Sequence, residues 1–90
     1  MKLYPTIHSA LPYGLPQYEI RGTQVYPTVN NARDTFGLPV FDRRGSHLYP
    51  TVHNQTHSYG LPALEVRGTQ LYPTIHNQVE TYGLPVFELR

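Results

Sequence analysis

A 23-residue repeat constrains the fold of this chain more than any other feature of its sequence. The motif Tyr/Phe-Gly-Leu-Pro recurs every 23 residues, beginning at Tyr13, Phe36, Tyr59 and Tyr82. A second motif, Tyr-Pro-Thr, begins at Tyr4, Tyr26, Tyr49 and Tyr72. A fixed period of this length is typical of architectures in which each copy is one small structural unit. We therefore expect four similar units in a single domain covering residues 1–90.

Each unit is predicted to be a β-hairpin. An Arg-Gly-Thr or Arg-Gly-Ser segment lies between two runs of alternating apolar and polar residues, as it does around Gly22. Glycine followed by a second residue between such runs is typical of a type II′ turn, in which the glycine takes a positive φ. This turn places Ile20 opposite Val25 and Glu19 opposite Tyr26. The three complete hairpins are expected at residues 15–30, 38–53 and 61–76.

Alternation along the strands predicts one apolar and one polar face for each hairpin. In the first hairpin the apolar face is expected to hold Pro16, Tyr18, Ile20, Val25, Pro27 and Val29. The polar face is expected to hold Gln17, Glu19, Arg21, Gln24, Tyr26, Thr28 and Asn30. In the third hairpin the inward residues are Leu64, Val66, Leu71, Pro73 and Ile75. Arg43 stands where the first hairpin has Ile20, so we expect it at an edge or reaching solvent through its apolar stem.

The two chain ends together predict a fourth hairpin. The sequence starts with Met-Lys-Leu-Tyr and stops with Glu-Leu-Arg, which are the two arms of the repeated hairpin without its turn glycine. Residues 84–90 could therefore pair with residues 1–8, with Leu89 beside Leu3 and Glu88 beside Tyr4. Such pairing closes a ring and removes exposed strand edges. Pairing of these ends between two chains, in a swapped or symmetric dimer, is the alternative.

Proline limits how far the strands can pair. The prolines of both motifs cannot donate to a β-ladder, so short hairpins that lean on one another are favoured over a tall eight-stranded barrel. The connecting stretches, such as residues 53–58, lack helical periodicity and are expected to be loops. The aromatic residue and the leucine of Tyr/Phe-Gly-Leu-Pro are expected to pack between copies. The predicted fold is all-β, with pseudo-fourfold symmetry, closed into a small propeller-like or barrel-like ring.

Composition narrows the possible partners. The chain has 7 Lys plus Arg and 6 Asp plus Glu, a net charge of +1, which argues against nucleic acid as the main partner. Cysteine is absent, so neither disulfides nor thiolate metal sites are available. Neither a signal peptide nor a run of about 18 apolar residues is expected to be present, which makes the cytoplasm the default location.

The predicted polar face repeats one set of side chains that could bind a ligand. Each copy carries a tyrosine opposite an acid, with an arginine two residues after the acid. The candidate ligand-binding residues are Tyr4, Tyr26, Tyr49 and Tyr72, Glu88, Glu19, Asp42 and Glu65, and Arg90, Arg21, Arg44 and Arg67. An aromatic ring beside charged groups suits a sugar or a peptide. Cross-strand pairs of this kind also stabilise a sheet, by roughly 0.2–1 kcal/mol each, so a purely structural role is the alternative.

A second repeated position completes the candidate site. It lies four residues after the tyrosine and holds His8, Asn30, His53 and His76. If these side chains converged on an axis, three imidazoles could approach a metal such as zinc. Asn30 interrupts the set and no carboxylate is identifiable behind it, so we predict no metal site and no cofactor.

The leading functional hypothesis is a non-enzymatic, multivalent binding module. Its ligand would be a glycan or an extended peptide, bound at one weak site per copy, and the number of sites would supply avidity. The sequence has no Gly-x-Ser-x-Gly motif and no phosphate-binding glycine loop, so we do not expect an enzyme. The pattern of short β repeats with one polar aromatic site each resembles tandem-repeat lectins in architecture. The alternative is a structural protein whose tyrosine-bearing face mediates contact with other proteins or with further copies of itself, as a homo-oligomer.

Overall fold

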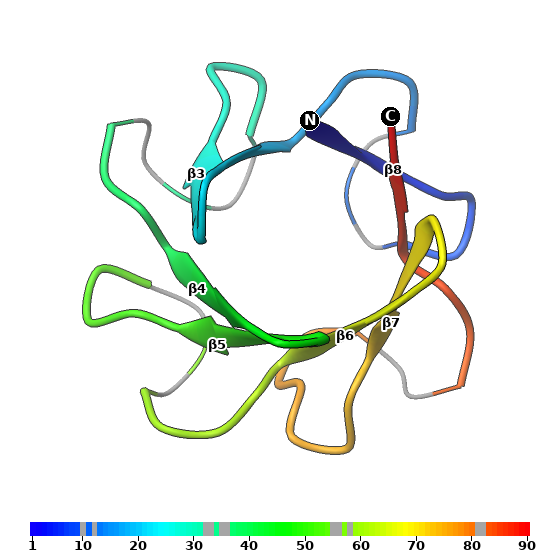
Figure 1. The fold of residues 1–90 in the computed structure, drawn as a ribbon. Coiled ribbons are helices and arrows are strands. Elements are labelled where there is room, and N and C mark those ends of the chain that lie inside the picture. Colours follow the sequence, from blue (N-terminus) through cyan, green and yellow to red (C-terminus); the bar gives the residue numbers. More distant parts are fainter. Residues whose placement is uncertain are drawn as a thin grey trace.

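Eight short strands form a closed barrel in the computed structural model (Figure 1). The structure describes residues 1–9, 11, 13–31, 34, 37–54, 57, 59–80 and 83–90. Within these residues the strands are β1 (Lys2–Pro5), β2 (Tyr18–Arg21), β3 (Gln24–Pro27), β4 (Phe41–Arg44), β5 (His47–Pro50), β6 (Leu64–Arg67), β7 (Gln70–Pro73) and β8 (Phe87–Leu89). All neighbours are antiparallel, and the barrel order follows the chain order. The predicted all-β ring is confirmed.

Three pairs of strands are hairpins with the predicted register. We call β2/β3 hairpin 1, β4/β5 hairpin 2 and β6/β7 hairpin 3. In hairpin 1, Glu19 pairs with Tyr26 and Ile20 with Val25. The turn glycines have φ between 62° and 65°, and no described residue other than glycine has a positive φ. This combination is that of a type II′ turn, because only its first central residue takes a positive φ.

The chain ends complete the ring within one molecule. Strand β8 pairs with β1, placing Leu3 opposite Leu89 and Tyr4 opposite Glu88. The backbone of Lys2 and that of Arg90 exchange two hydrogen bonds of 2.9 Å each. We call β8/β1 the closing hairpin. The termini lie next to each other at its open end in Figure 1.

Strand pairing runs around the whole ring, so the short hairpins pair with one another rather than only leaning together. Pro5, Pro27, Pro50 and Pro73 are the last residues of their strands, where no ladder bond is required of them. Between hairpins the pairing is short. Two residues of one strand face two of the next, as in Gln24 opposite Asp42 and Val25 opposite Phe41. The barrel is therefore continuous but low.

Inward side chains fill the barrel in layers. Leu3, Val25, Leu48 and Leu71 form one fully buried layer. Tyr18, Phe41, Leu64 and Phe87 form the next layer, at the end of the barrel that carries the long loops. The Tyr18 ring packs edge-on against Phe41 and Phe87, with centroids 5.7 and 5.5 Å apart. Edge-to-face packing of this kind adds stability beyond the burial of apolar area.

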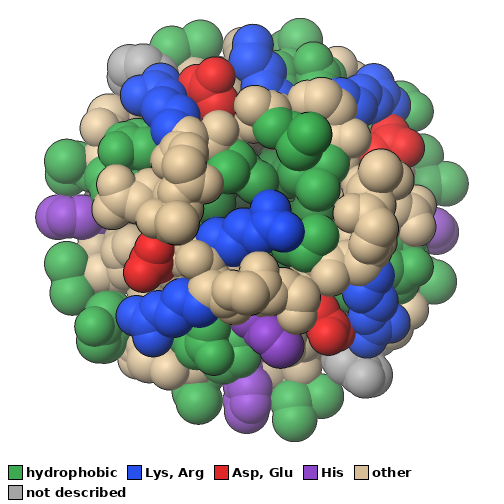
Figure 2. All heavy atoms as spheres, in the orientation of Figure 1, with side chains coloured by type: hydrophobic (Ala, Val, Ile, Leu, Met, Phe, Trp, Pro, Cys, Tyr) green, Lys and Arg blue, Asp and Glu red, His purple; other side chains and the backbone are tan. Residues whose placement is uncertain are grey.

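Arg43 lies at the turn end of the barrel interior. Its position in the other hairpins is held by Ile20, Val66 and Leu89, which pack partly buried against the core. The Arg43 side chain is half-buried and its Nε donates to the carbonyl of Gly45 at 3.1 Å. Figure 2 shows a basic side chain at the centre of this face, within a ring of apolar and polar atoms. The stem of Arg43 thus covers the core while its charged group reaches the surface, as expected.

The alternation of inward and outward side chains ends where the strands end. Two residues that were expected to face inward are therefore exposed. Val29 and Ile75 are 76% and 74% exposed rather than buried. The chain turns directly after Pro27: the hydroxyl of Thr28 donates to the carbonyl of Pro16 at 2.6 Å and accepts from the backbone of Asn30. Pro16 itself is half-buried. A turn fixed by a threonine hydroxyl breaks the period of two.

Two further packing predictions are wrong. Gln17 is buried, although it was assigned to the polar face, and its counterparts in the other copies are Val40, Ala63 and Val86. Tyr13 and Tyr59 are 67% exposed, and the leucines of the same motif are also exposed, so these residues do not pack between copies: Leu15, Leu38, Leu61 and Leu84. Phe36 and Tyr82, to which the same prediction applied, lie outside the described residues.

One layer at the long-loop end of the barrel is mostly polar. The corresponding positions of the four copies hold Leu11, Asp34, His57 and Glu80, all buried. The hydroxyl of Tyr18 donates to Oδ2 of Asp34 at 2.8 Å. The side chains of Asn31, Asn54 and Asn77 each accept from the backbone amide three residues later and donate to a carbonyl of the neighbouring strand segment. These asparagines tie the long loops to the barrel.

Candidate functional site

The outer surface of each hairpin carries the predicted tyrosine, acid and arginine together. The acid and the arginine are two residues apart, on one strand in hairpins 1 to 3 and at the end of β8 in the closing hairpin, and therefore point to the same side. The tyrosine faces the acid from the paired strand. The four sets are Tyr4, Glu88 and Arg90; Tyr26, Glu19 and Arg21; Tyr49, Asp42 and Arg44; and Tyr72, Glu65 and Arg67.

The arginine of each set stacks on the tyrosine. The Cζ atoms of the four arginines lie 4.5–4.7 Å from the centroids of the tyrosine rings. The guanidinium also contacts the acid, at 2.8 Å for Arg90 and Glu88 and 3.5 Å for Arg44 and Asp42. One face of each half-buried tyrosine is thus covered by a cation, so these rings are not open platforms on that side.

Charge is balanced within each of these sets, because one guanidinium accompanies one carboxylate. The hydrogen bond between Arg90 and Glu88 raises the pKa of Arg90 above its ordinary value, which keeps the guanidinium charged. Both Nε and Nη2 of Arg90 contact Oε1 of Glu88, at 2.9 and 2.8 Å. The second carboxylate oxygen, Oε2, accepts no hydrogen bond from the described residues. It is available to a ligand.

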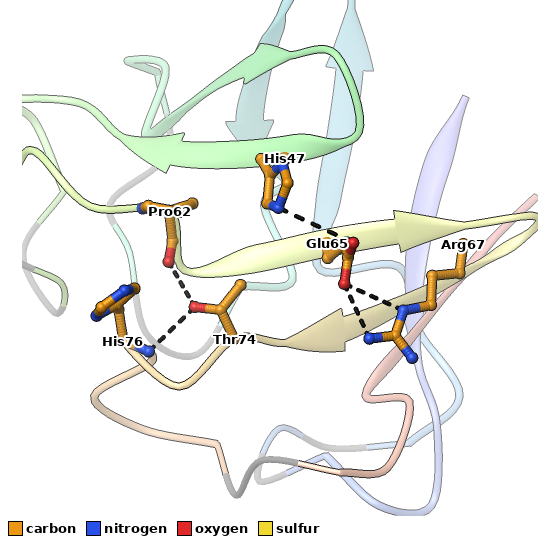
Figure 3. Close-up of polar contacts among 6 residues, drawn as sticks. All are labelled: His47, Pro62, Glu65, Arg67, Thr74 and His76. Carbon is orange, nitrogen blue, oxygen red and sulfur yellow. Dashed lines mark hydrogen bonds and ion pairs between the residues drawn. The ribbon is translucent and has the colours of Figure 1, made fainter.

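Hairpin 3 shows a variation on this arrangement (Figure 3). Arg67 contacts Oε1 of Glu65 at 2.9 Å, while Nε2 of His47 lies 3.9 Å from Oε2 of the same carboxylate. Thr74 fixes the following turn by donating to the carbonyl of Pro62 and accepting from the backbone amide of His76. Figure 3 places His76 on the far side of Thr74 from Glu65 and Arg67. His76 is therefore not part of the same polar cluster.

Two pockets lie beside the tyrosine, acid and arginine sets. A pocket of about 320 Å³ at the closing hairpin is lined by Pro5, Thr6, Ile7, His8, Tyr13, Gln70, Pro85, Glu88 and Arg90. A pocket of about 280 Å³ at hairpin 2 is lined by Pro50, Thr51, Val52, His53, Tyr59, Gln24, Pro39, Asp42 and Arg44. The two linings correspond position by position in the repeat. Only Ile7 with Val52 and Glu88 with Asp42 differ in residue type.

The pockets include residues that sequence reasoning did not assign to a site. Tyr13 and Tyr59 come from the long loops, and a smaller hollow brings Tyr59 together with Arg44 and Tyr49. Gln70 and Gln24 come from the strand that precedes each acid around the ring. The exposed tyrosines carry a signal in the sequence, because an aromatic residue recurs at that position in all four copies. The glutamines recur only in alternate copies.

The surroundings of the repeated histidine or asparagine position differ between copies. The residues at this position are His8, Asn30, His53 and His76. All four side chains are exposed; His8 and His53 line the two pockets described above, and His76 lines a further hollow beside Tyr59 and Leu61. Among the residues that the structure describes, no three His, Asp or Glu side chains approach one another closely enough to hold a metal ion. The four side chains thus belong to separate loops rather than to a shared axis.

In comparisons with protein-family models, with curated protein sequences and with solved structures, no match to the chain was found. The described residues also contain no helix long and apolar enough to cross a membrane.

Proposed function

We propose that this protein is a non-enzymatic glycan-binding module that binds its ligand in pockets on the outer surface of the barrel. The observation that supports this proposal is the recurrence of one pocket, with one lining, in two copies of the repeat. At about 320 and 280 Å³, the pockets lie at the lower limit of small-ligand sites, and they combine apolar walls with a few polar groups.

The chemistry of the lining fits a saccharide. The ring of Tyr13 or Tyr59 is 67% exposed, so it offers an open face on which the C–H groups of a sugar can stack. Glu88 supplies an acceptor for hydroxyl groups, and Arg90 supplies donors. Their charges cancel, which favours a neutral ligand over a phosphate or a carboxylate.

The closed barrel favours a glycan over an extended peptide. Peptides that bind β-proteins commonly add a strand to an exposed sheet edge, where backbone hydrogen bonds provide affinity. Every described strand of this barrel pairs on both sides, so no such edge is present. A peptide would have to rely on side-chain contacts in the pockets alone.

Capture on a printed array of neutral and acidic glycans tests the proposal. We expect the fluorescently labelled protein to bind neutral glycans, and the double variant Tyr13→Ala, Tyr59→Ala to bind about three- to tenfold more weakly, because one stacking contact is worth about 0.5–1.5 kcal/mol. The double variant Leu15→Ala, Leu38→Ala is the control, since it removes exposed apolar side chains outside both pockets. Absence of any glycan binding by the unaltered protein would refute the proposal.

Assembly with other proteins is the second candidate, because the long loops expose many large apolar side chains. Ile7 and Val52 are 77% and 75% exposed, and the leucines of the Tyr/Phe-Gly-Leu-Pro motif are exposed in all four copies. Repeated apolar exposure of this extent marks interaction surfaces in many proteins. Sedimentation velocity distinguishes this candidate: if the Leu15→Ala, Leu38→Ala variant sediments as a smaller species than the unaltered protein, the apolar loops mediate self-association.

A further inference from the structure

The four copies of the binding site are not equivalent. They differ in residue type at one position of the repeat. This position belongs to the neighbouring hairpin and pairs with the acid of the site. It is Gln70 opposite Glu88, Gln24 opposite Asp42, His47 opposite Glu65 and Lys2 opposite Glu19. The two glutamines belong to the two pockets described above.

The glutamine side chain is held in a defined orientation. Tyr72 donates a hydrogen bond to Oε1 of Gln70 at 3.4 Å, and Tyr26 does the same for Gln24 at 3.2 Å. Because the carbonyl oxygen is engaged, the amide nitrogen of each glutamine keeps its two donors for a ligand. That nitrogen is hydrogen-bonded to no other described residue.

Histidine changes this arrangement in hairpin 3. Nε2 of His47 lies 3.9 Å from Oε2 of Glu65, which corresponds to the carboxylate oxygen that Glu88 leaves available. The imidazole also packs edge-on against the ring of Tyr49, with centroids 6.4 Å apart. His47 therefore occupies the space beside this acceptor, where the other two sites have a glutamine.

Lysine changes the charge of the site in hairpin 1. Lys2 adds a second cation next to Glu19 and Arg21, so this site carries an excess positive charge where the glutamine sites are neutral. Asn30 also replaces the histidine that lines both pockets. A neutral saccharide loses two of its partners here.

We infer that the protein is bivalent, with its two glutamine-containing pockets as the working sites for neutral saccharide units. This inference rests on the proposed glycan-binding function. The closing hairpin and hairpin 2 alternate with the other two hairpins around the ring, and therefore lie on opposite sides of a molecule whose Cα trace is 27 Å wide (Figure 1). Two opposed sites bind separate saccharide chains and cross-link them, and the resulting gain in avidity requires a multivalent surface.

The stoichiometry of binding tests this inference. Isothermal titration with the neutral oligosaccharide that the array retains best is expected to give two sites per chain. The variant His47→Gln should raise this number to three, because it gives hairpin 3 the glutamine of the other pockets and removes the imidazole from the space beside Oε2 of Glu65. The double variant Gln24→His, Gln70→His should lose binding at least about tenfold. Thr23→His is the control, since it places an imidazole at a barrel turn outside both pockets.

Each outcome separates the inference from the function on which it rests. Four equivalent sites in the unaltered protein would overturn bivalency and leave glycan binding intact. Two sites that do not respond to either glutamine substitution would overturn the role of the glutamines. No heat of binding with any array-selected saccharide would refute the proposed function itself. Urea denaturation of each variant, expected to match the unaltered protein, shows that a lost site is not a lost fold.

Discussion

Joining the two chain ends through one glycine tests whether the ring closes within a single molecule. In hairpin 1 the paired residues Arg21 and Gln24 are connected by Gly22 and Thr23. In the closing hairpin Arg90 pairs with Lys2 in the same way, through two backbone hydrogen bonds of 2.9 Å. Met1 stands at the position of Thr23. A single glycine between Arg90 and Met1 therefore restores the missing type II′ turn.

The expected gain in stability follows from chain entropy. Closing a loop of about 91 residues lowers the entropy of the unfolded chain by an amount equivalent to about 4.6 kcal/mol at 25 °C. Strain subtracts little, because the folded ends already occupy the positions that the turn requires. We expect the cyclic protein to be about 3–5 kcal/mol more stable than the linear one, a large change for a domain whose total stability is about 5–14 kcal/mol.

Urea denaturation measures this difference. The cyclic chain is prepared by intein ligation, and the control is the linear chain with the same glycine at its C-terminus, so that both proteins have one composition. Unfolding is followed by tyrosine fluorescence and extrapolated linearly to water. A gain below about 1 kcal/mol, or a loss, would refute closure within the monomer and would favour pairing of the ends between two chains.

Two further substitutions probe the interior. Leu71→Ala should lower the free energy of unfolding by about 2–5 kcal/mol, because Leu71 is fully buried. Leu61→Ala in the same copy should change it by less than about 0.5 kcal/mol, because Leu61 is exposed. Equal effects of the two variants in urea denaturation would contradict the assignment of the core. Tyr18→Phe should cost about 1–3 kcal/mol, because it removes the hydrogen bond to buried Asp34; a thermal midpoint at or above that of the unaltered protein would show that this bond contributes nothing.

The three turn-linked hairpins could be predicted from the sequence because they depend on local rules. A glycine that begins a type II′ turn sets the register, and a period of two then sorts the strand residues, as Ile20 opposite Val25 shows. The fourth hairpin followed from the match between the two ends and the other copies. Apart from this pairing of the two ends, these features require no knowledge of how distant segments pack.

The loops could not be predicted in the same way, because side-chain hydrogen bonds rather than alternation determine their path. The hydroxyl of Thr28 turns the chain after Pro27 and directs Val29 to solvent. Alternation predicts Gln17 on the polar face, although its apolar counterparts Val40 and Val86 indicate a buried position.

The candidate site was predicted in part. The registers and stacking contacts of Tyr26, Glu19 and Arg21 follow from strand geometry alone. The contribution of Tyr59 depends on where a long loop returns, and that of Gln24 depends on which hairpin lies beside which acid. Both contributions depend on tertiary contacts between copies, which the residue pattern within one copy does not reveal.

The short pairing between hairpins determines how this barrel can open. Each interface between successive hairpins pairs two residues with two, whereas the turn-linked hairpins pair four with four. Local fluctuations should therefore separate whole hairpins and leave each one intact. Because the four interfaces share one geometry, an opened molecule presents edges that fit those of any other opened molecule. Exchange of hairpins between molecules needs no new contact, only a high enough concentration.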